Sequence, residues 1–322
     1  MTGIRMLRTV AFATGALGGL SGAAYGLLTE QSRRARRVIG VPETPPLRAD
    51  GVYLPDGSGP FAPDDTDNAD NAAAAGTPLT FAVLGDSSAA GVGVDAPEEL
   101  PGVLLALGLA AEAERPVRLV THAISGATTR ELPGQVDAAL VEPPDLALVI
   151  IGANDVTTQL SVRTSAELLG EQVARLRAAG VSVVVGTCPD LGAIRPIPQP
   201  LRSVARTWSL ALARAQRRTV AAAGGQPVPL ADLLSPEFLT RPAELFSTDQ
   251  FHPSAAGYAA AREVLLPALC VAAAVWSGPV PAAPARSATA EARRPTARIV
   301  SRLNRALRRA EAARPAEGVA AE

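Results

Sequence analysis

The chain contains few of the residues on which several large classes of protein depend. It has only 2 cysteines, Cys188 and Cys270, and only 2 histidines among 322 residues. Two cysteines do not build a disulfide framework, and with two histidines they supply too few ligands for a multi-ligand zinc site. We therefore do not expect a multi-ligand zinc site.

Aromatic residues and net charge are scarce as well. Aromatics make up 3% of the chain, which argues against base-stacking platforms and against a broad sugar-stacking groove. The formal net charge is -1, so no overall basic field attracts nucleic acid. Lysine is absent, because all 30 basic residues are arginine, and we interpret this as compositional bias. Nucleic acid is therefore not an expected partner.

Apolar residues, in contrast, make up 48% of the chain, which is ample for a sizeable core. From Leu79 onward, continuous apolar runs such as LALVII alternate with helical patterns. This alternation predicts an α/β fold, a three-layer α/β/α sandwich with a mostly parallel five-stranded sheet covered on both faces. The expected strands are 79–84, 117–122, 145–151, 181–186 and 227–231, and the expected helices are 98–113, 129–140, 164–179, 201–223 and 254–272.

An uncharged stretch near the N-terminus, residues 9–29, is about long enough to span a ~30 Å hydrocarbon core. Arginines flank it, and glycines four residues apart suit close helix packing. Small residues at Ser21-Gly22-Ala23 also fit a cleaved signal peptide, and a soluble helix is a third interpretation. The pattern favours a membrane anchor within residues 1–40. A membrane-anchored or exported protein is expected, while the side of the membrane and the oligomeric state are left open.

Two further segments flank the predicted α/β domain, which spans residues 79–278. Residues 41–78 are rich in Pro, Gly, Asp and Ala, a composition that predicts a flexible acidic linker. Residues 279–322 begin as a Pro/Ala-rich linker and continue into a basic segment, 296–313, with apolar residues on one helical face. Such a helix can lie on an anionic membrane surface, but a solvated tail is the simpler interpretation.

Polar clusters follow the first three predicted strands. The stretch FAVLGDSSAAGVGV at 81–94 runs from a strand into Gly-Asp-Ser-Ser, and SG at 125–126 and GAND at 152–155 follow the next two strands. Each cluster alone also suits an ordinary turn. Because ligands bind at the carboxyl ends of the strands in parallel sheets, we expect the clusters to form a single site.

A serine nucleophile at neutral pH needs a base, and the chain offers only two histidines. His122 lies inside a predicted strand, where we expect it to pack or cap. His252 lies in STDQFHPSAAGYAA, just before the last predicted helix. A turn can bring Asp249 to its imidazole, where an acid fixes the tautomer and stabilises the imidazolium. Asp86 and Asp155 are rivals for this role, and spacing alone does not exclude them.

The same strand ends offer donors for a negatively charged oxygen. Gly126 lets the backbone approach a ligand and presents an unencumbered N–H. An uncharged amide at the end of an apolar strand is costly to bury without partners, so Asn154 is expected to direct its NH2 at a specific acceptor.

The blocks GDSS, SG, GAND and DQFH occur in this order along the chain. The ordered set resembles the SGNH hydrolases, also called the GDSL esterase/lipase family, over residues 79–272. The resemblance implies a flavodoxin-like fold and hydrolysis of carboxylic esters through an acyl-serine intermediate, with a small acyl-ester or lipid substrate and no cofactor. It assigns Ser87 as nucleophile, Asp249 and His252 as its triad partners, and the Ser87 N–H, Gly126 and Asn154 as the oxyanion hole.

The sequence departs from the family pattern in two places. Ser88 stands where the family has leucine, which leaves the nucleophile in place. His122-Ala123 stands where an asparagine often precedes the second-block glycine, a change that affects supporting hydrogen bonds but removes no catalytic group.

Other enzyme classes are poorly supported. Ser87 is not in a G-x-S-x-G motif, so the sequence does not indicate the nucleophile elbow of the α/β-hydrolases. The chain also lacks the phosphate-binding motif GxxxxGK[ST], so it does not indicate a nucleotide-dependent enzyme. The alternative is a membrane-tethered binding protein that keeps the fold without activity. The presence of every group that a hydrolase needs favours the enzyme. TCPDLGAIRPIPQPLR at 187–202 is expected to line an acyl pocket or a lid, while lipid, short-chain ester, thioester and O-acetyl sugar all remain open as substrates.

Overall fold

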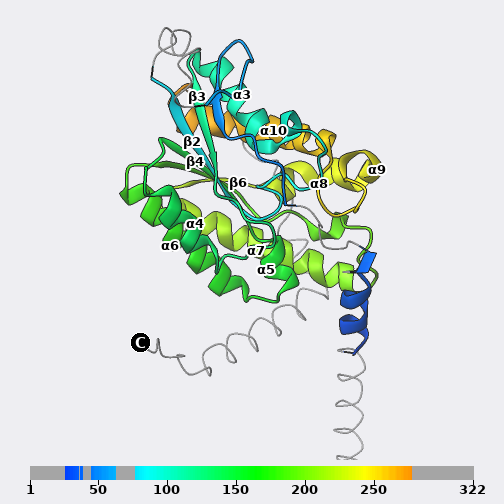
Figure 1. Cartoon of the computed structure of the whole chain (residues 1–322). Helices are drawn as coiled ribbons and strands as arrows, with labels where there is room; N and C mark the ends of the chain where they lie inside the picture. Colours follow the sequence, from blue (N-terminus) through cyan, green and yellow to red (C-terminus); the bar gives the residue numbers. More distant parts are fainter. Residues whose placement is uncertain (1–25, 36, 39–44, 63–76, 278–322) are drawn as a thin grey trace, which may run out of the picture.

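The computed structural model describes residues 26–35, 37–38, 45–62 and 77–277. In this part of the chain a six-stranded sheet lies between two layers of helices (Figure 1). The strand order is β1-β3-β2-β4-β5-β6; β2 to β6 are parallel, and β1 is antiparallel to β3. The strands are β1 (Gly51–Tyr53), β2 (Leu79–Gly85), β3 (Val117–Thr121), β4 (Leu146–Ile150), β5 (Ser182–Gly186) and β6 (Gln226–Val228).

The helices divide between the two faces of the sheet (Figure 1). One face is covered by α3 (Pro101–Ala113) and α10 (Ala255–Ala272), which pack on each other. The other face is covered by α4 (Leu132–Ala139), α6 (Val162–Ala178) and α7 (Leu201–Ala222). The remaining elements are the short helix α5 (Ala153–Thr157), the 3-10 turns η1 (Pro97–Glu99) and η2 (Leu191–Ala193), and α8 (Leu230–Thr240) and α9 (Pro242–Leu245), which connect β6 to α10.

Alternate residues of the central strands enter two different apolar clusters. On β2, Phe81 and Val83 pack in the cluster that contains residues of α3 and α10. Ala82 and Leu84 pack in the cluster that contains residues of α4, α6 and α7. All four side chains are buried. Burial on both faces explains why the strands appear in the sequence as continuous apolar runs rather than alternating patterns.

The sheet differs from the expected one at both of its edges. Five strands were predicted, and the sixth, β1, comes from the stretch 41–78 that we expected to be a linker throughout. Val52 and Tyr53 are buried there, and β1 pairs with β3. At the other edge the strand expected at 227–231 ends at Val228, and α8 begins at Leu230. Both edge strands have three residues, too few for a period to be recognised.

The expected end segments fall mainly outside the described residues. These are residues 9–25 of the predicted anchor, residues 63–76 of the predicted linker and residues 278–322. Among the helices searched in the described ranges, only α10 is long and apolar enough to cross a membrane. It packs against α3, and Leu265 and Leu269 are buried in the core, so its apolar composition is explained by packing inside the domain.

Candidate active site

The carboxyl end of β2 presents Ser87. The conformation of Gly85 has φ +136°, and a Cβ at this position would lie 1.9 Å from the Ile150 carbonyl oxygen of β4, so only glycine fits. The next residue, Asp86, donates its N–H to that same carbonyl at 3.0 Å. Ser87 follows and is buried. Gly85, the glycine of the GDSS block, therefore allows β2 and β4 to approach closely.

A second glycine allows the loop that carries His252 to approach the nucleophile turn. Gly93 has φ +107°, and a Cβ there would lie 2.5 Å from the Pro253 carbonyl oxygen and 3.0 Å from Cβ of His252. The loop itself is closed by Asp249, whose Oδ1 accepts from the N–H groups of Phe251 at 2.8 Å and His252 at 2.9 Å. The loop geometry thus fixes the spacing of the acid and the imidazole.

Ser87, His252 and Asp249 are joined by hydrogen bonds. His252 Nε2 lies 2.9 Å from Ser87 Oγ, and His252 Nδ1 lies 2.5 Å from Asp249 Oδ2. Partial burial favours a raised pKa for Asp249, but hydrogen bonds from His252 and the backbone outweigh it and lower the pKa to about 2. The carboxylate is therefore ionised at neutral pH. Such a chain of groups can remove a proton from the serine hydroxyl and hold the resulting imidazolium.

The two rival carboxyl groups are engaged elsewhere. Asp86 Oδ1 accepts from the Ser88 N–H at 3.0 Å, and Asp155 Oδ1 accepts from the Thr129 N–H at 2.9 Å. Burial raises the pKa of Asp86 to about 7 and also raises the pKa of Asp155. The hydrogen bond of Asp155 joins the loops that follow β4 and β3, whereas that of Asp86 lies within the turn that follows β2.

The loops that follow β2, β3 and β4 meet at one edge of the sheet, because β2 pairs with both of its neighbours. Gly126 is exposed, has φ +83°, and has no atom within 4 Å of the position that a Cβ would take. Asn154 lies in α5, and its Nδ2 donates to the Ala127 carbonyl at 3.0 Å. The amide is thereby tied to the loop that contains Gly126. His122 lies at the end of β3 and donates its N–H to the Val83 carbonyl.

Two buried glutamines support these strand ends, and the motifs do not indicate either of them. Gln135 accepts from the Gly85 N–H at 2.7 Å and donates to its carbonyl at 2.9 Å. Gln216 accepts from the Cys188 N–H at 2.7 Å and donates to the Ile151 carbonyl at 3.0 Å. The available signal is a glutamine on an otherwise apolar helix face, which needs a hydrogen-bonding partner inside the protein.

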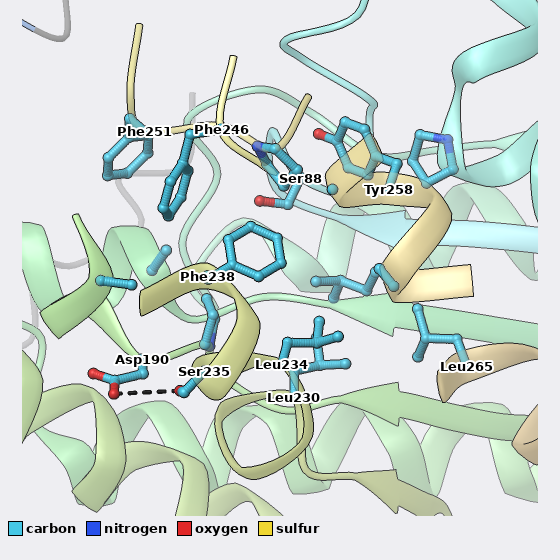
Figure 2. A pocket seen from close by; sticks show the side chains of 18 of the residues that line it. Ser88, Asp190, Leu230, Leu234, Ser235, Phe238, Phe246, Phe251, Tyr258 and Leu265 are labelled. Carbon is cyan, nitrogen blue, oxygen red and sulfur yellow. Dashed lines mark hydrogen bonds between the residues drawn. The ribbon is translucent and has the colours of Figure 1, made fainter. Parts of the chain in front are cut away.

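An apolar cavity with a volume of about 100 Å³ adjoins this site (Figure 2). Its lining includes Ser88 and Pro253, the chain neighbours of Ser87 and His252. The segment 187–202, which was expected to line a pocket, contributes to the wall through Pro189, Asp190, Leu191, Ala193 and Ile194.

The described ranges contain no group of three or more His, Cys, Asp or Glu side chains placed to hold a metal ion. Both Cys188 and Cys270 are buried and unpaired. Burial raises the pKa of each thiol, that of Cys270 to about 11, so neither is a reactive thiolate at neutral pH.

Comparisons with known proteins agree with the arrangement of the fold. The sequence profile of the GDSL-like Lipase/Acylhydrolase family matches residues 83–260. The chain is 46% identical to the GDSL-like esterase Rv1075c of Mycobacterium tuberculosis (strain ATCC 25618 / H37Rv) over 273 residues, which cover 81% of this chain and 82% of that protein.

Two solved structures also resemble this chain. TesA has a TM-score of 0.50 and 24% identity, covering 60% of this chain and 99% of that chain. The lipase/acylhydrolase from Enterococcus faecalis has a TM-score of 0.45 and 22% identity, and the match covers 58% of this chain and 93% of that chain. The likeness to TesA is one of fold alone. The matching profile and the relative at 46% identity show that the chain belongs to the GDSL-like lipase/acylhydrolase family.

Proposed function

We propose that the protein is a serine hydrolase that cleaves carboxylic esters through an acyl-serine intermediate on Ser87. Membership of a lipase/acylhydrolase family supplies the class of reaction, and the name GDSL-like esterase of the mycobacterial relative points to the same chemistry. The observation that carries the proposal is the chain of contacts from Ser87 Oγ through the His252 imidazole to Asp249, at 2.9 and 2.5 Å.

The proposed reaction has two halves that use the same base. Ser87 Oγ attacks the ester carbonyl carbon while His252 Nε2 takes the hydroxyl proton. The tetrahedral intermediate then breaks its bond to the alcohol oxygen, and His252 returns the proton to the departing alcohol. A water molecule next attacks the acyl-serine as His252 again accepts a proton. The carboxylic acid leaves, and the proton on His252 returns to Ser87.

The ionised Asp249 orients the imidazole in both halves. Its low pKa, about 2, means that it keeps its charge while His252 is protonated. The negative oxygen of each tetrahedral intermediate is assigned to the Ser87 N–H, the Gly126 N–H and the Asn154 amide. Asn154 has two N–H bonds and gives one to the Ala127 carbonyl, so the other is available to the substrate oxygen.

The proposal is tested by steady-state hydrolysis of p-nitrophenyl butyrate by the full chain. Ser87→Ala and His252→Ala are each expected to lower kcat by several orders of magnitude, since members of a triad act as a unit. Asn154→Ala is expected to lower kcat by roughly 10²–10³, the usual effect of losing one oxyanion donor. Circular dichroism of each variant checks that the fold is kept.

Two matched variants serve as controls. Ser88→Ala removes the neighbouring hydroxyl, and His122→Ala removes the other imidazole; in the described structure the hydrogen bonds of the Ser87, His252 and Asp249 side chains to one another involve neither of these side chains. Both variants should keep most of the activity. Full activity in Ser87→Ala, or an equal loss in Ser88→Ala, would contradict the assignment of the nucleophile.

The location of the enzyme is a separate proposal. Attachment to a membrane through residues 9–29 stays a prediction based on the length and composition of that stretch, as does export by a cleaved signal. Neither is needed for the chemistry at Ser87.

A further inference from the structure

The cavity beside the nucleophile has a wall of aromatic rings. Phe238 of α8 and Phe246, which follows α9, meet edge to face with ring centroids 5.0 Å apart. Phe251 also lines the cavity and packs edge to face against the His252 imidazole at 4.9 Å. Figure 2 shows the three phenylalanines gathered near Ser88. Three aromatic rings thus form part of the cavity wall close to the neighbour of Ser87.

The polar side chains of the wall already have partners within the protein. Asp190 accepts from the Gly192 N–H at 2.8 Å, lies 3.3 Å from the Arg206 guanidinium, and lies 3.3 Å from the Ser235 hydroxyl (Figure 2). The Ser235 hydroxyl also contacts the Ala231 carbonyl. These groups are satisfied without a ligand.

The same is true of the two polar residues that α10 contributes. Tyr258 donates its hydroxyl to the Val92 carbonyl at 2.7 Å, and Arg262 donates Nε to the Leu104 carbonyl at 3.2 Å. Ser88 completes the polar lining, and it lies next to the nucleophile. A sugar hydroxyl placed deep in this cavity would lose its hydrogen bonds to water without replacing them, which is unfavourable. The wall suits a hydrocarbon chain.

The cavity ends against the main core. Ile150, Leu230 and Leu265 line it and belong to the cluster packed between the sheet and α3 and α10, whereas Phe238 and Phe246 belong to the neighbouring cluster. Its volume is about 100 Å³. A cavity of this volume has room for several methylene-sized groups.

From these observations we infer that the cavity binds the acyl chain of the substrate and selects acyl groups of medium length. The inference rests on the proposed ester hydrolysis at Ser87. A short acetyl group would leave most of the apolar wall without a partner. A chain longer than the cavity would exceed the space in front of Leu230 and Leu265.

The occupant is the acyl group rather than the alcohol. After the first half of the reaction the alcohol must leave so that water can attack, while the acyl group stays bonded to Ser87. A cavity that is lined on one side by core residues suits an occupant that stays in place through both halves of the reaction. It therefore suits the group that remains attached.

The test is a series of p-nitrophenyl esters from acetate to palmitate, hydrolysed by the full chain. Each methylene that enters the cavity should raise kcat/KM by up to about fourfold, with a maximum between hexanoate and decanoate and a fall for palmitate. We expect octanoate to exceed acetate by at least tenfold. Ethyl octanoate compared with octyl acetate then separates the acyl group from the alcohol, and ethyl octanoate should be the better substrate.

A variant that fills the cavity tests which residues form the site. Leu234 of α8 lines the cavity (Figure 2), and Leu234→Trp should lower the octanoate-to-acetate ratio of kcat/KM at least tenfold. Leu239→Trp, on the same helix and partly buried but outside the lining, should leave that ratio unchanged. Binding of octanoate to Ser87→Ala, measured by calorimetry, should disappear when Leu234→Trp is added.

The outcomes separate the two proposals. If kcat/KM did not change with acyl length, was highest for acetate, or was higher for octyl acetate than for ethyl octanoate, the proposed acyl site would be wrong. Turnover that depends on Ser87 would in that case still support ester hydrolysis. Octanoate binding that is lost with Leu234→Trp, without turnover of any ester, would support the cavity and contradict the proposed function. Unchanged chain-length ratios in Leu234→Trp would also overturn the acyl site.

Discussion

Two carboxyl groups near the nucleophile turn, those of Asp249 and Asp86, have different pKa values because their surroundings differ. Asp249 accepts hydrogen bonds from the imidazole and two backbone N–H groups, which lower its pKa to about 2 despite partial burial. Asp86 is buried, and burial outweighs its hydrogen bond from the Ser88 N–H, so its pKa rises to about 7. An acid that orients an imidazolium must be ionised, and Asp249 meets this requirement best.

Burial of Asp86 predicts a pH dependence of stability. Its pKa is about 7 in the folded protein, raised by burial from the ordinary value of 3.8 that applies to the unfolded chain. Between these values the folded state holds a proton that the unfolded state releases, so the free energy of unfolding should fall as the pH rises through this window. Asp86→Asn should make the fall shallower and should be more stable than the wild type at about pH 8. Urea unfolding from about pH 4 to about pH 8 measures both effects.

The control for this prediction is Asp95→Asn, because Asp95 is exposed; that variant should reproduce the wild-type curve. Parallel curves for Asp86→Asn and the wild type would show that Asp86 is not protonated in the folded state near neutral pH. The whole account of the buried carboxyl would then be wrong.

The proximity of Ser87 and His252 was predictable because each residue lies in a block of the family motif, while their catalytic roles stay predictions. The contact of Ser87 with His252 spans 165 positions, yet the order of the four blocks was sufficient to bring both residues to the same edge of the sheet. Gln135 and the Ala127 carbonyl were not predictable in this way. Their partners, Gly85 and Asn154, are distant in sequence, and a hydrogen bond between a side chain and a remote backbone group produces no local pattern.

At the scale of elements, long apolar runs in the sequence predicted the central strands and helices, whereas the two short edge strands of the sheet could not be predicted with correct bounds. The five central helices and the strands β2 to β5 lie close to their expected positions, since each is buried over several residues. β1 has three residues and pairs with β3, far along the chain. The sequence prediction placed the end of β6 too late, because Pro229 and Leu230 continue the apolar run of this strand. A proline is, however, typical of an edge strand or of the end of a strand.

The presence of β1 changes where a stable fragment must begin. A chain that starts at residue 45 keeps β1, whereas a chain that starts at residue 75 loses the buried Val52 and Tyr53 and leaves β3 as an open edge. The shorter chain should be less stable by roughly 1.5–3 kcal/mol per buried side chain lost and should aggregate through its free edge. Urea unfolding and light scattering of the two fragments measure this. Equal stability and solubility would mean that β1 contributes nothing to the sheet.

At the scale of the whole molecule, one segment outside the sheet contacts the domain near the cavity. Residues 26–35 are helical. Gln31 donates to the Gln199 carbonyl at 2.6 Å and accepts from the Leu201 N–H at 3.1 Å, and Ala35 is buried in the cluster that contains Ile194. Residues 26–35 are therefore held against the 187–202 segment. Nothing in the sequence indicated this contact, because residues 41–78, which follow, have the composition of a linker.

The central claim, that Ser87 is the nucleophile of an ester hydrolase, is tested most directly by covalent labelling. Diethyl p-nitrophenyl phosphate transfers its phosphoryl group to an activated serine, and the adduct is located by intact mass and peptide mapping. We expect a single adduct on Ser87, loss of ester hydrolysis in proportion to labelling, and no adduct in Ser87→Ala. An adduct on another serine, or full hydrolysis by protein whose Ser87 is labelled, would contradict the account.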